Sequence, residues 1–573
     1  MRSGLVFGAT AFLAVGCGGD EEEPGWSPEL YCPGDPSGVC DALPGTPLLA
    51  GTASRSVVPT CYESWVDLDD NATYAAGEGE TFLDCGCDRL CPGDAGYTGA
   101  DEGEGDGVFQ AIWLGGFQNS RPASGVRDAT LGLRGEGDGL YATAIVLSQG
   151  NTTLGIVAID AVGWMIDDVT AMREAVRAAG VDVDHLVVHS SHVHEAPDTM
   201  GIWGPTISET GYDAAYAEEV YAAVADAVVE AHGAMEEVEV ELGAVDAGDY
   251  ADNGVANLIS DTRDPVIVPP LVSSARFFRP DGSTVATLVH WANHPETVAD
   301  DNALFTSDFV HALRLTVSEG VQWDGQEPRD GVGGRTLFLN GAVGGMMTSL
   351  RADVLDPTGV LWSEHSFEKA DVVGQIVGEM VLDGLEDPEP VDWADLWFRV
   401  DELQLPVDNT GFQAMFILGV IGHRQTYNYD DSQPIDEDNW PWVATEVDLI
   451  GLGPLRLLTI PGEPLPELAI GGYDGSFTPP GEELVDLTEP NAPDVSAAPG
   501  GPYWHDLMGG EHPWVIGLAN DEVGYIIPEY NFVVAEAGAY IFEADGDHYE
   551  ETNSLGPQTA GLITESIERL VSW

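Results

Sequence analysis

Histidines are concentrated in one short stretch of this chain. Four of the 13 lie within ten residues of one another, at His185, His189, His192 and His194. The apolar run 185–189 is typical of a buried strand, and a loop follows it. In α/β sheets, loops at the carboxyl ends of strands build binding sites. We therefore expect one histidine of the pair at 192 and 194 to bind a metal and the other to hydrogen bond, with solvated rings as the alternative.

Three later segments also place metal-competent side chains after apolar runs. His294 follows such a run at a turn defined by Pro295, and fits a structural role as well as ligation. Glu463 stands in the turn Pro461-Gly462-Glu463, where a solvated carboxylate is the simpler interpretation. Segment 547–554 alone indicates only a polar turn. The four segments lie far apart in the sequence.

The elements that would position these side chains follow an α/β pattern. Apolar runs at 155–160 and 185–189 flank a helical pattern at 167–179, and this β-α-β order predicts a parallel strand pair. Further helices are expected at 213–234 and 367–385. Further strands are expected at 236–243, 273–278, 284–291, 335–340, 443–449 and 455–460. The Pro-, Gly- and Asp-rich stretch 473–501 predicts a long loop.

Composition excludes several classes of function. The 573 residues include 98 Asp and Glu against 20 Lys and Arg, a formal net charge of −78. Such a charge repels phosphate backbones and anionic lipids, so we expect no nucleic-acid partner and no electrostatic membrane docking. The hydrophobic content of 44% supports a large folded core rather than disorder. HExxH, Walker A, GxGxxG and GxSxG motifs are absent, which disfavours zincin, P-loop, Rossmann and α/β-hydrolase chemistry.

In their order along residues 108–573, the segments resemble the neutral/alkaline (non-lysosomal) ceramidase family, zinc-dependent amidases that split ceramide into fatty acid and sphingosine. The family's Thr-His-Thr-His-Ser-Gly-Pro is similar to Ser191-His192-Val193-His194-Glu195-Ala196-Pro197. Its Pro-Gly-Glu is similar to Pro461-Gly462-Glu463. A strand-ending histidine and a late Tyr-Glu turn of the family resemble His294 and Tyr549-Glu550.

The resemblance implies a fold and a set of residue roles. The fold is α/β, a ceramidase-like catalytic domain of mixed sheets with flanking helices. The implied ligands of Zn²⁺ are His192, His294, Glu463 and Tyr549. The implied catalytic residues are His194 as hydrogen-bond partner of the reacting carbonyl, Arg263 near the substrate, and Asp160 in support. The implied substrate-binding positions are Gly115, Gly116, Gly344 and Thr348.

The implied reaction is hydrolysis of a C–N amide bond in an N-acylated lipid by metal-activated water. One loop departs from the family pattern, because Met347 stands where the family has a serine beside the scissile bond and Gly345 replaces an Asp. Thr348 or Ser349 substitutes for that serine only after a shift of register. Two alternatives stay open: a surface-anchored binding lipoprotein that has lost catalysis, and a zinc hydrolase of another amide or an ester.

The first residues predict export. Arg2, an apolar run and the sequence Leu13-Ala14-Val15-Gly16-Cys17 resemble a bacterial lipoprotein signal, with an ordinary secretory signal as the alternative. Residues 1–16 would then be removed and Cys17 acylated. We expect membrane anchoring only through this lipidated terminus, and an outer-membrane lipoprotein on the periplasmic or cell-surface side.

The other six cysteines lie within residues 32–91. An even number in an exported protein predicts up to three disulfides, and the sequence does not choose among the pairings of Cys32, Cys40, Cys61, Cys85, Cys87 and Cys91. The expected organisation is a signal (1–16), an acidic tether (17–30), a Cys-rich module (31–97), a linker (98–107) and the ceramidase-like zinc hydrolase domain (108–573).

Overall fold

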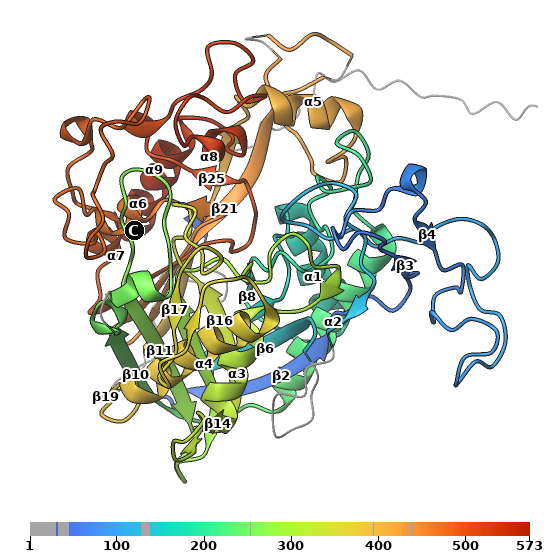
Figure 1. The fold of residues 1–573 in the computed structure, drawn as a ribbon. Coiled ribbons are helices and arrows are strands. Elements are labelled where there is room, and N and C mark those ends of the chain that lie inside the picture. The colour runs from blue at the N-terminus through green and yellow to red at the C-terminus, as the bar shows by residue number, and fades with distance from the viewer. Residues whose placement is uncertain are drawn as a thin grey trace, which may run out of the picture.

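A computed structural model describes residues 30–31, 45–127, 138–251, 254–392, 395–430, 432–436 and 439–572. The predicted signal peptide, Cys17, Cys32, Cys40 and nearly all of the acidic tether lie outside these ranges. Three five-stranded sheets and their helices form the body (Figure 1). Among the described helices, none is both long and apolar enough to cross a membrane.

The first sheet, ordered β8-β7-β6-β2-β9, carries the histidine-rich segment at the end of β8. β7 and β8 pair in parallel, as the β-α-β pattern predicts, and β6 pairs antiparallel with β2 and β7. Helices α1 and α2 cover its outer face. The bounds are β2 Leu49–Ser56, β6 Tyr141–Gln149, β7 Thr152–Ile159, α1 Ile166–Ala178, β8 His185–Ser190, α2 Ala214–Gly233 and β9 Glu236–Glu237.

The second sheet, ordered β16-β12-β11-β10-β19, carries His294 just beyond β12. β12 and β16 pair in parallel, so both end at the same edge. Helices α3 and α4 pack against this sheet through Phe309 and Val373. The bounds are β10 Glu239–Asp246, β11 Leu271–Phe278, β12 Thr284–Trp291, α3 Phe309–Glu319, β16 Arg335–Asn340, α4 Phe367–Gly384 and β19 Glu389–Pro390.

The third sheet, ordered β1-β20-β21-β22-β24, carries Glu463 shortly after β22. Helices α7 and α9 cover its outer face. The bounds are β1 Leu30–Tyr31, β20 Leu396–Pro406, α5 Thr410–Leu418, β21 Trp442–Leu452, β22 Leu455–Thr459, β23 Glu463–Pro464, α6 Pro466–Ile470, α7 Trp504–Met508, β24 His512–Ile516, β25 Tyr525–Ile526, α8 Tyr549–Thr552 and α9 Thr559–Ser572.

The inner faces of the three sheets meet in one apolar core. Ile156, Leu288 and Leu457, one from each sheet, belong to the same buried cluster. Because helices cover the other faces, most sheet strands are buried on both sides, which explains their continuous apolar runs. The predicted mixed α/β class is confirmed, and the predicted strand at 236–243 begins and ends three residues later, as β10.

Two disulfides lie among the described cysteines, Cys61–Cys87 and Cys85–Cys91. They sit in a segment that carries β3 (Trp65–Val66) and β4 (Thr81–Phe82) and projects at the right of Figure 1. Strand β2 falls within the range expected for the Cys-rich module, yet it is a member of the first sheet. The module's boundaries at 31 and 97 stay a prediction, and part of that range builds the core of the body.

Candidate metal centre

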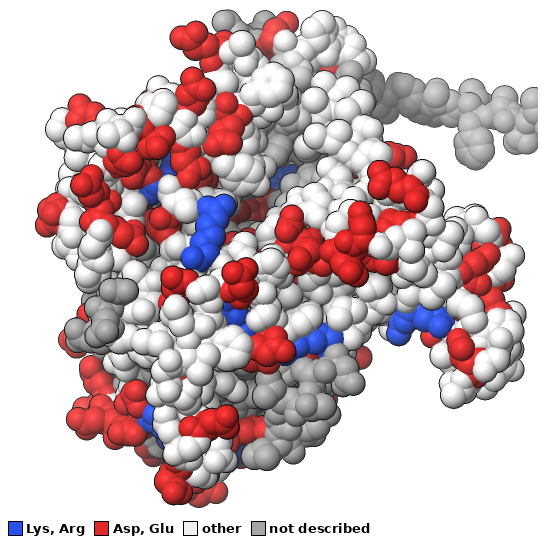
Figure 2. Space-filling model, in the orientation of Figure 1, with Lys and Arg blue, Asp and Glu red and all other residues white. Residues whose placement is uncertain are grey.

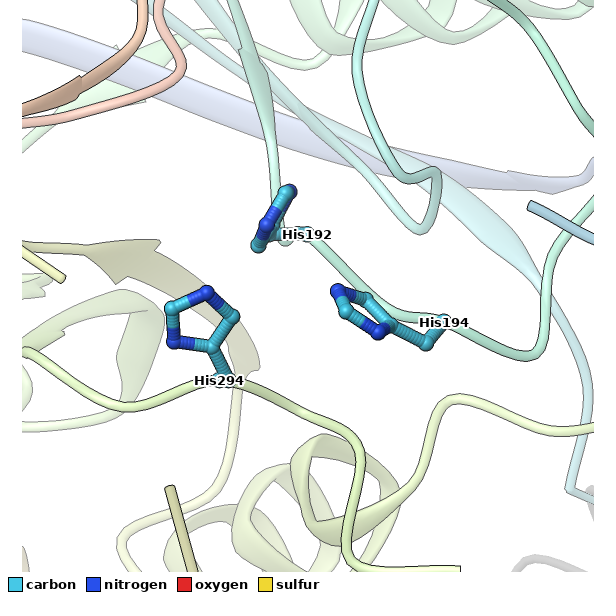
Figure 3. Close-up of side chains that lie close together, drawn as sticks. All are labelled: His192, His194 and His294. Atoms are coloured by element: carbon cyan, nitrogen blue, oxygen red, sulfur yellow. The ribbon is translucent and has the colours of Figure 1, made fainter. Parts of the chain in front are cut away.

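Three histidines from two loops converge at one point, with their rings facing one another (Figure 3). His192, His194 and His294 are all buried, and one nitrogen of each lies within 4.8 Å of the others. The Glu463 carboxylate joins them, because its Oε2 lies 3.3 Å from Nε2 of His192 and 3.0 Å from Nε2 of His294. The fold therefore brings three of the four predicted zinc ligands together.

Backbone carbonyls fix the orientation of two rings. Nδ1 of His192 lies 2.6 Å from the Val162 carbonyl oxygen, and Nδ1 of His294 lies 2.9 Å from that of Met347. A carbonyl only accepts, so each Nδ1 donates its proton there, and Nε2 is the nitrogen that faces the Glu463 carboxylate. Two imidazole nitrogens and one carboxylate oxygen therefore converge on one point, and this N, N, O donor set fits a metal ion.

The electrostatics of Glu463 support the same interpretation. Burial acts to raise the pKa of this carboxyl, but the His192 and His294 rings outweigh burial and hold it well below its usual value. For His294, burial acts to lower the pKa, and Glu463 reverses that into an increase. Glu463 is therefore ionised at neutral pH, which is the form that binds a cation.

Tyr549, the fourth predicted ligand, lies at the start of α8 on the wall of the same pocket. It lines this pocket together with His192, His194 and Glu463, and its side chain is 41% exposed. The other lining residues include the apolar Met200, Ile202, Trp203 and Phe412. Tyr549 is thus within the site, while its ligation of a metal stays a prediction.

Glu296 is a site carboxylate that the sequence did not single out. Its Oε2 lies 3.2 Å from Nδ1 of His194. Burial acts to raise the pKa of Glu296, but His194 and His294 lower it to about 2. Burial lowers the pKa of His194 to about 4, with Glu296 opposing the change. His194 is therefore a neutral imidazole at neutral pH whose Nδ1 faces an ionised carboxylate.

The predicted glycine turn lies directly against His194. Gly116 has a φ of 95°, and a Cβ at this position would stand 2.3 Å from Cγ of His194. The Gly115 N–H donates to the Ala196 carbonyl at 3.0 Å. Buried Arg121 donates from Nη2 to the carbonyls of Gly115 and His194. Position 116 therefore requires glycine, because a Cβ would clash with the His194 ring and because the backbone there is left-handed.

Gly344 and Thr348 lie on the loop that supports the ligands. The Gly344 N–H donates to the Pro464 carbonyl at 2.9 Å, and a Cβ on Gly344 would stand 2.6 Å from the Glu463 carbonyl oxygen. Thr348 forms an isolated β-bridge with His294. The Met347 side chain is fully buried in the core, so only its carbonyl reaches the site. The structure gives Gly344 and Thr348 a positioning role; their contact with substrate stays a prediction.

Arg263 and Asp160 lie in buried ion pairs. Arg263 contacts Glu550 at 2.7 Å and Glu551 at 3.0 Å, and so holds the helix that carries Tyr549. Asp160 is paired with Arg314 at 2.8 Å and accepts from the Ser191 hydroxyl at 3.4 Å, next to His192. Through these contacts the two residues hold segments that carry site residues. The direct catalytic roles expected for both residues stay predictions.

Asn340, the last residue of β16, ties the two histidine loops together. Its Nδ2 donates to the carbonyls of Ser191 at 3.1 Å and Asn293 at 3.0 Å, and its Oδ1 accepts from the Asn293 N–H at 3.1 Å. All of these groups are buried. One side chain therefore links the two histidine loops, beside the backbone hydrogen bond from the His194 N–H to the Pro295 carbonyl.

Replacing Asn340 by alanine is expected to weaken metal binding about 10- to 100-fold, the usual effect of losing a group that orients ligands. Two buried carbonyls lose their donor, so the free energy of unfolding should also fall by about 1–3 kcal/mol. Metal titration and denaturant unfolding measure the two effects. Asn491→Ala, which removes an exposed donor, serves as the control. Unchanged metal affinity in the Asn340 variant contradicts this role.

A buried carboxyl cluster beside α8 predicts a dependence of stability on pH. Burial raises the pKa of Glu467 from 4.5 to about 7, with Arg263 partly opposing, and raises that of Glu550 to about 7. The pKa values of these carboxyls are higher in the folded than in the unfolded protein. Their contribution to stability is therefore full below pH 4.5 and is lost as pH rises through 7. In the parent, the free energy of unfolding is expected to fall between pH 5 and 8. In Glu467→Gln we expect this fall to be smaller, by up to about 3 kcal/mol. Urea unfolding across this pH range measures the slope, with the exposed Glu483→Gln as control; an unchanged slope overturns the expectation.

Comparison with known proteins adds evidence about the fold. The chain matches no protein-family model and no curated protein sequence. Among solved structures, neutral ceramidase from Pseudomonas aeruginosa matches with a TM-score of 0.55 and 11% identity, over 92% of this chain and 74% of that one. A ceramidase complexed with C2 matches with a TM-score of 0.54 and 12% identity, over 92% and 75%. The chain therefore has a ceramidase-like fold, as the sequence resemblance implies.

Proposed function

We propose that this protein is a zinc-dependent hydrolase that cleaves the C–N amide bond of an N-acylated lipid. The observation that carries the proposal is the convergence of two backbone-fixed Nε2 atoms on the Glu463 carboxylate. Imidazole nitrogen and carboxylate oxygen are a donor set that suits zinc. A metal held by His192, His294 and Glu463 supplies Lewis acidity and a water of lowered pKa. The ceramidase-like fold supports an amide as the bond that is cleaved.

His194 and Glu296 supply the proton transfer. Glu296 faces Nδ1 of His194, so it favours the tautomer that leaves Nε2 free to accept a proton. Water adds to the carbonyl carbon, and its proton passes to Nε2 of His194. The imidazolium is stabilised by Glu296 and returns that proton to the amide nitrogen as the C–N bond breaks, leaving a carboxylic acid and an amine. While protonated, His194 is also the carbonyl's hydrogen-bond donor that the sequence resemblance implies.

The pocket walls suit an acyl amide. Met200, Ile202, Trp203 and Phe412 form apolar walls beside the polar residues, which fits a carbonyl bound at the histidines and a hydrocarbon chain beside it. This route uses no serine, so Met347 at the family serine position does not prevent it. For the same reason, the binding-only alternative gains no support from the altered loop.

Metal analysis and a substrate panel test the proposal. Purified protein is expected to contain one zinc per chain and to hydrolyse N-acyl lipid amides, with activity lost to a chelator and restored by zinc. N-acyl amides and esters of several chain lengths identify the bond and separate an amidase from an esterase. Hydrolysis at full rate without metal contradicts the mechanism, and stoichiometric zinc without any hydrolysis favours the binding lipoprotein.

We also propose that the protein is exported and anchored through an acylated Cys17. The two disulfides support an oxidising compartment. Metabolic labelling with a radioactive fatty acid tests the anchor. Label is expected in the parent and absent from Cys17→Ser, and an unlabelled parent favours an ordinary secretory signal.

A further inference from the structure

Helix α5 exposes apolar side chains to solvent. Its sequence, TGFQAMFIL, has no charged residue, and Gln413 is its only buried side chain. Ile417 and Leu418 are 59% and 63% exposed. A surface helix normally buries its apolar residues and exposes its polar ones, whereas α5 buries Gln413 and leaves Ile417 and Leu418 exposed at its carboxyl end. Apolar surface of this kind marks a contact with another apolar body.

A second segment extends this surface beside the helix. Ile541 and Phe542 are 55% and 64% exposed. The Thr410 hydroxyl donates to the Ala539 carbonyl at 3.0 Å, and Cδ1 of Ile541 lies 3.7 Å from the place of a Cβ on Gly411. Gly411 and Leu418 are seven residues apart and so share a helix face. We call Phe412, Ile417, Leu418, Ile541 and Phe542 the apolar rim.

The apolar rim adjoins the candidate metal centre. Phe412 lines the pocket together with His192 and Glu463. Met415 and Phe416, on the same helix, pack with Ile202 and Trp203, which line the pocket as well. An apolar body seated on the rim is therefore next to the pocket that holds the histidines.

Charge identifies the kind of apolar body. The stretch 409–422 contains no Asp, Glu, Lys or Arg in a chain of net charge −78, and the surface over α5 is white in Figure 2. Inserting this stretch into lipid desolvates no charge, while the acidic remainder of the surface is repelled by anionic headgroups. The α5 part of the rim therefore matches a lipid surface of no net charge, and the exposed Glu543 borders the rim beside Phe542.

We infer that the apolar rim docks the protein on an uncharged lipid bilayer, a contact beyond the lipidated terminus that the sequence predicts as the only anchor, so that an N-acyl lipid passes from the bilayer into the pocket without crossing water. This inference rests on the proposed function for its substrate, and the docking itself is measured without substrate. Ile417 and Leu418 insert as the apolar face of an interfacial helix, next to Ile541 and Phe542.

Vesicle flotation tests the docking. All proteins lack the predicted signal (residues 1–16) and carry Cys17→Ser, so that neither the apolar signal nor an acyl chain contributes to binding. The parent is expected to float with phosphatidylcholine vesicles, and the double variant Ile417→Ser/Leu418→Ser to bind at least tenfold more weakly. Leu487→Ser is the matched control, because Leu487 is 83% exposed and lies outside the rim. Thermal unfolding checks that each variant is folded.

Further readouts separate docking from catalysis. Hydrolysis of a short-chain, dispersed N-acyl amide is expected to be equal in the parent and the double variant, whereas hydrolysis of the same amide in vesicles falls with binding. Vesicle binding that persists although no amide is cleaved refutes the proposed function but not the docking. A parent that does not float, or a double variant that binds like the parent, overturns the docking. A dimeric parent that becomes monomeric in the double variant also overturns it, because a second copy then covers the rim.

Discussion

Glu463→Gln is expected to release the metal and to lower kcat/KM by more than about 100-fold, beyond the effect of losing a group that only orients ligands. Glutamine keeps the volume of the side chain but replaces an anionic oxygen by a neutral amide. Its N–H₂ group can donate to the Nε2 lone pairs of His192 and His294, which lie 3.3 and 3.0 Å from Oε2 of Glu463. The variant is therefore expected to keep its fold while the proposed cation loses the Glu463 carboxylate.

Metal content by mass spectrometry of the native protein and single-turnover hydrolysis measure the two effects. Glu467→Gln is the matched control, because it makes the same change in an equally buried carboxyl four residues away. The control should retain zinc and activity. Since a ligand that binds only the folded state stabilises it, chelation should lower the unfolding temperature of the parent and leave that of Glu463→Gln unchanged. A Glu463 variant with full zinc content shows that the metal is held elsewhere.

The sequence predicts the elements of this fold well because most of them are buried on two faces. Continuous apolar runs mark β7, β8, β12 and β16, and the strand-helix-strand order correctly predicts the parallel pairing of β7 with β8. Helix α5 is a counterexample. Its apolar residues look like a core segment, and only the tertiary structure shows that they are exposed.

Residue type alone predicts the site only where that type is scarce, and Glu463 is predicted only through the family resemblance. Histidine clustering points to His192 and His194 among 13 histidines, whereas Glu296 is one of 98 acidic residues and carries no signal of its own. Its position two residues after His294 is the one available clue. The partners of Arg263 lie nearly 300 residues along the chain, so its ion pairs follow from the packing of α8 and not from any local pattern. Asn340 is equally hidden, because its role depends on two loops that meet only in the folded protein.

His194→Ala is expected to lower kcat about 10²- to 10⁴-fold, the usual range for losing a proton-transfer group, while leaving zinc bound. The structure offers two roles for this ring, since its nitrogen also lies within 4.8 Å of those of His192 and His294. The Glu296 contact distinguishes them. His192 and His294 direct Nδ1 at backbone carbonyls and share Glu463, whereas His194 directs Nδ1 at its own carboxylate, 3.2 Å away. The facing carboxylate partly offsets the lowering of the His194 pKa by burial and leaves Nε2 as the nitrogen that accepts a proton.

Glu296→Gln completes the test, because it neutralises the carboxylate that faces Nδ1 of His194. We expect zinc to be retained and kcat to fall about 10- to 100-fold, less than in His194→Ala, since the imidazole remains but its protonated form loses the facing negative charge. In the double variant, the Glu296 change should cost almost nothing further, because it acts through His194. If His194→Ala loses zinc, the His194 ring is a third nitrogen ligand of the metal and not the proton-transfer group. If the two decreases in kcat add in the double variant, Glu296 acts on the reaction independently of His194.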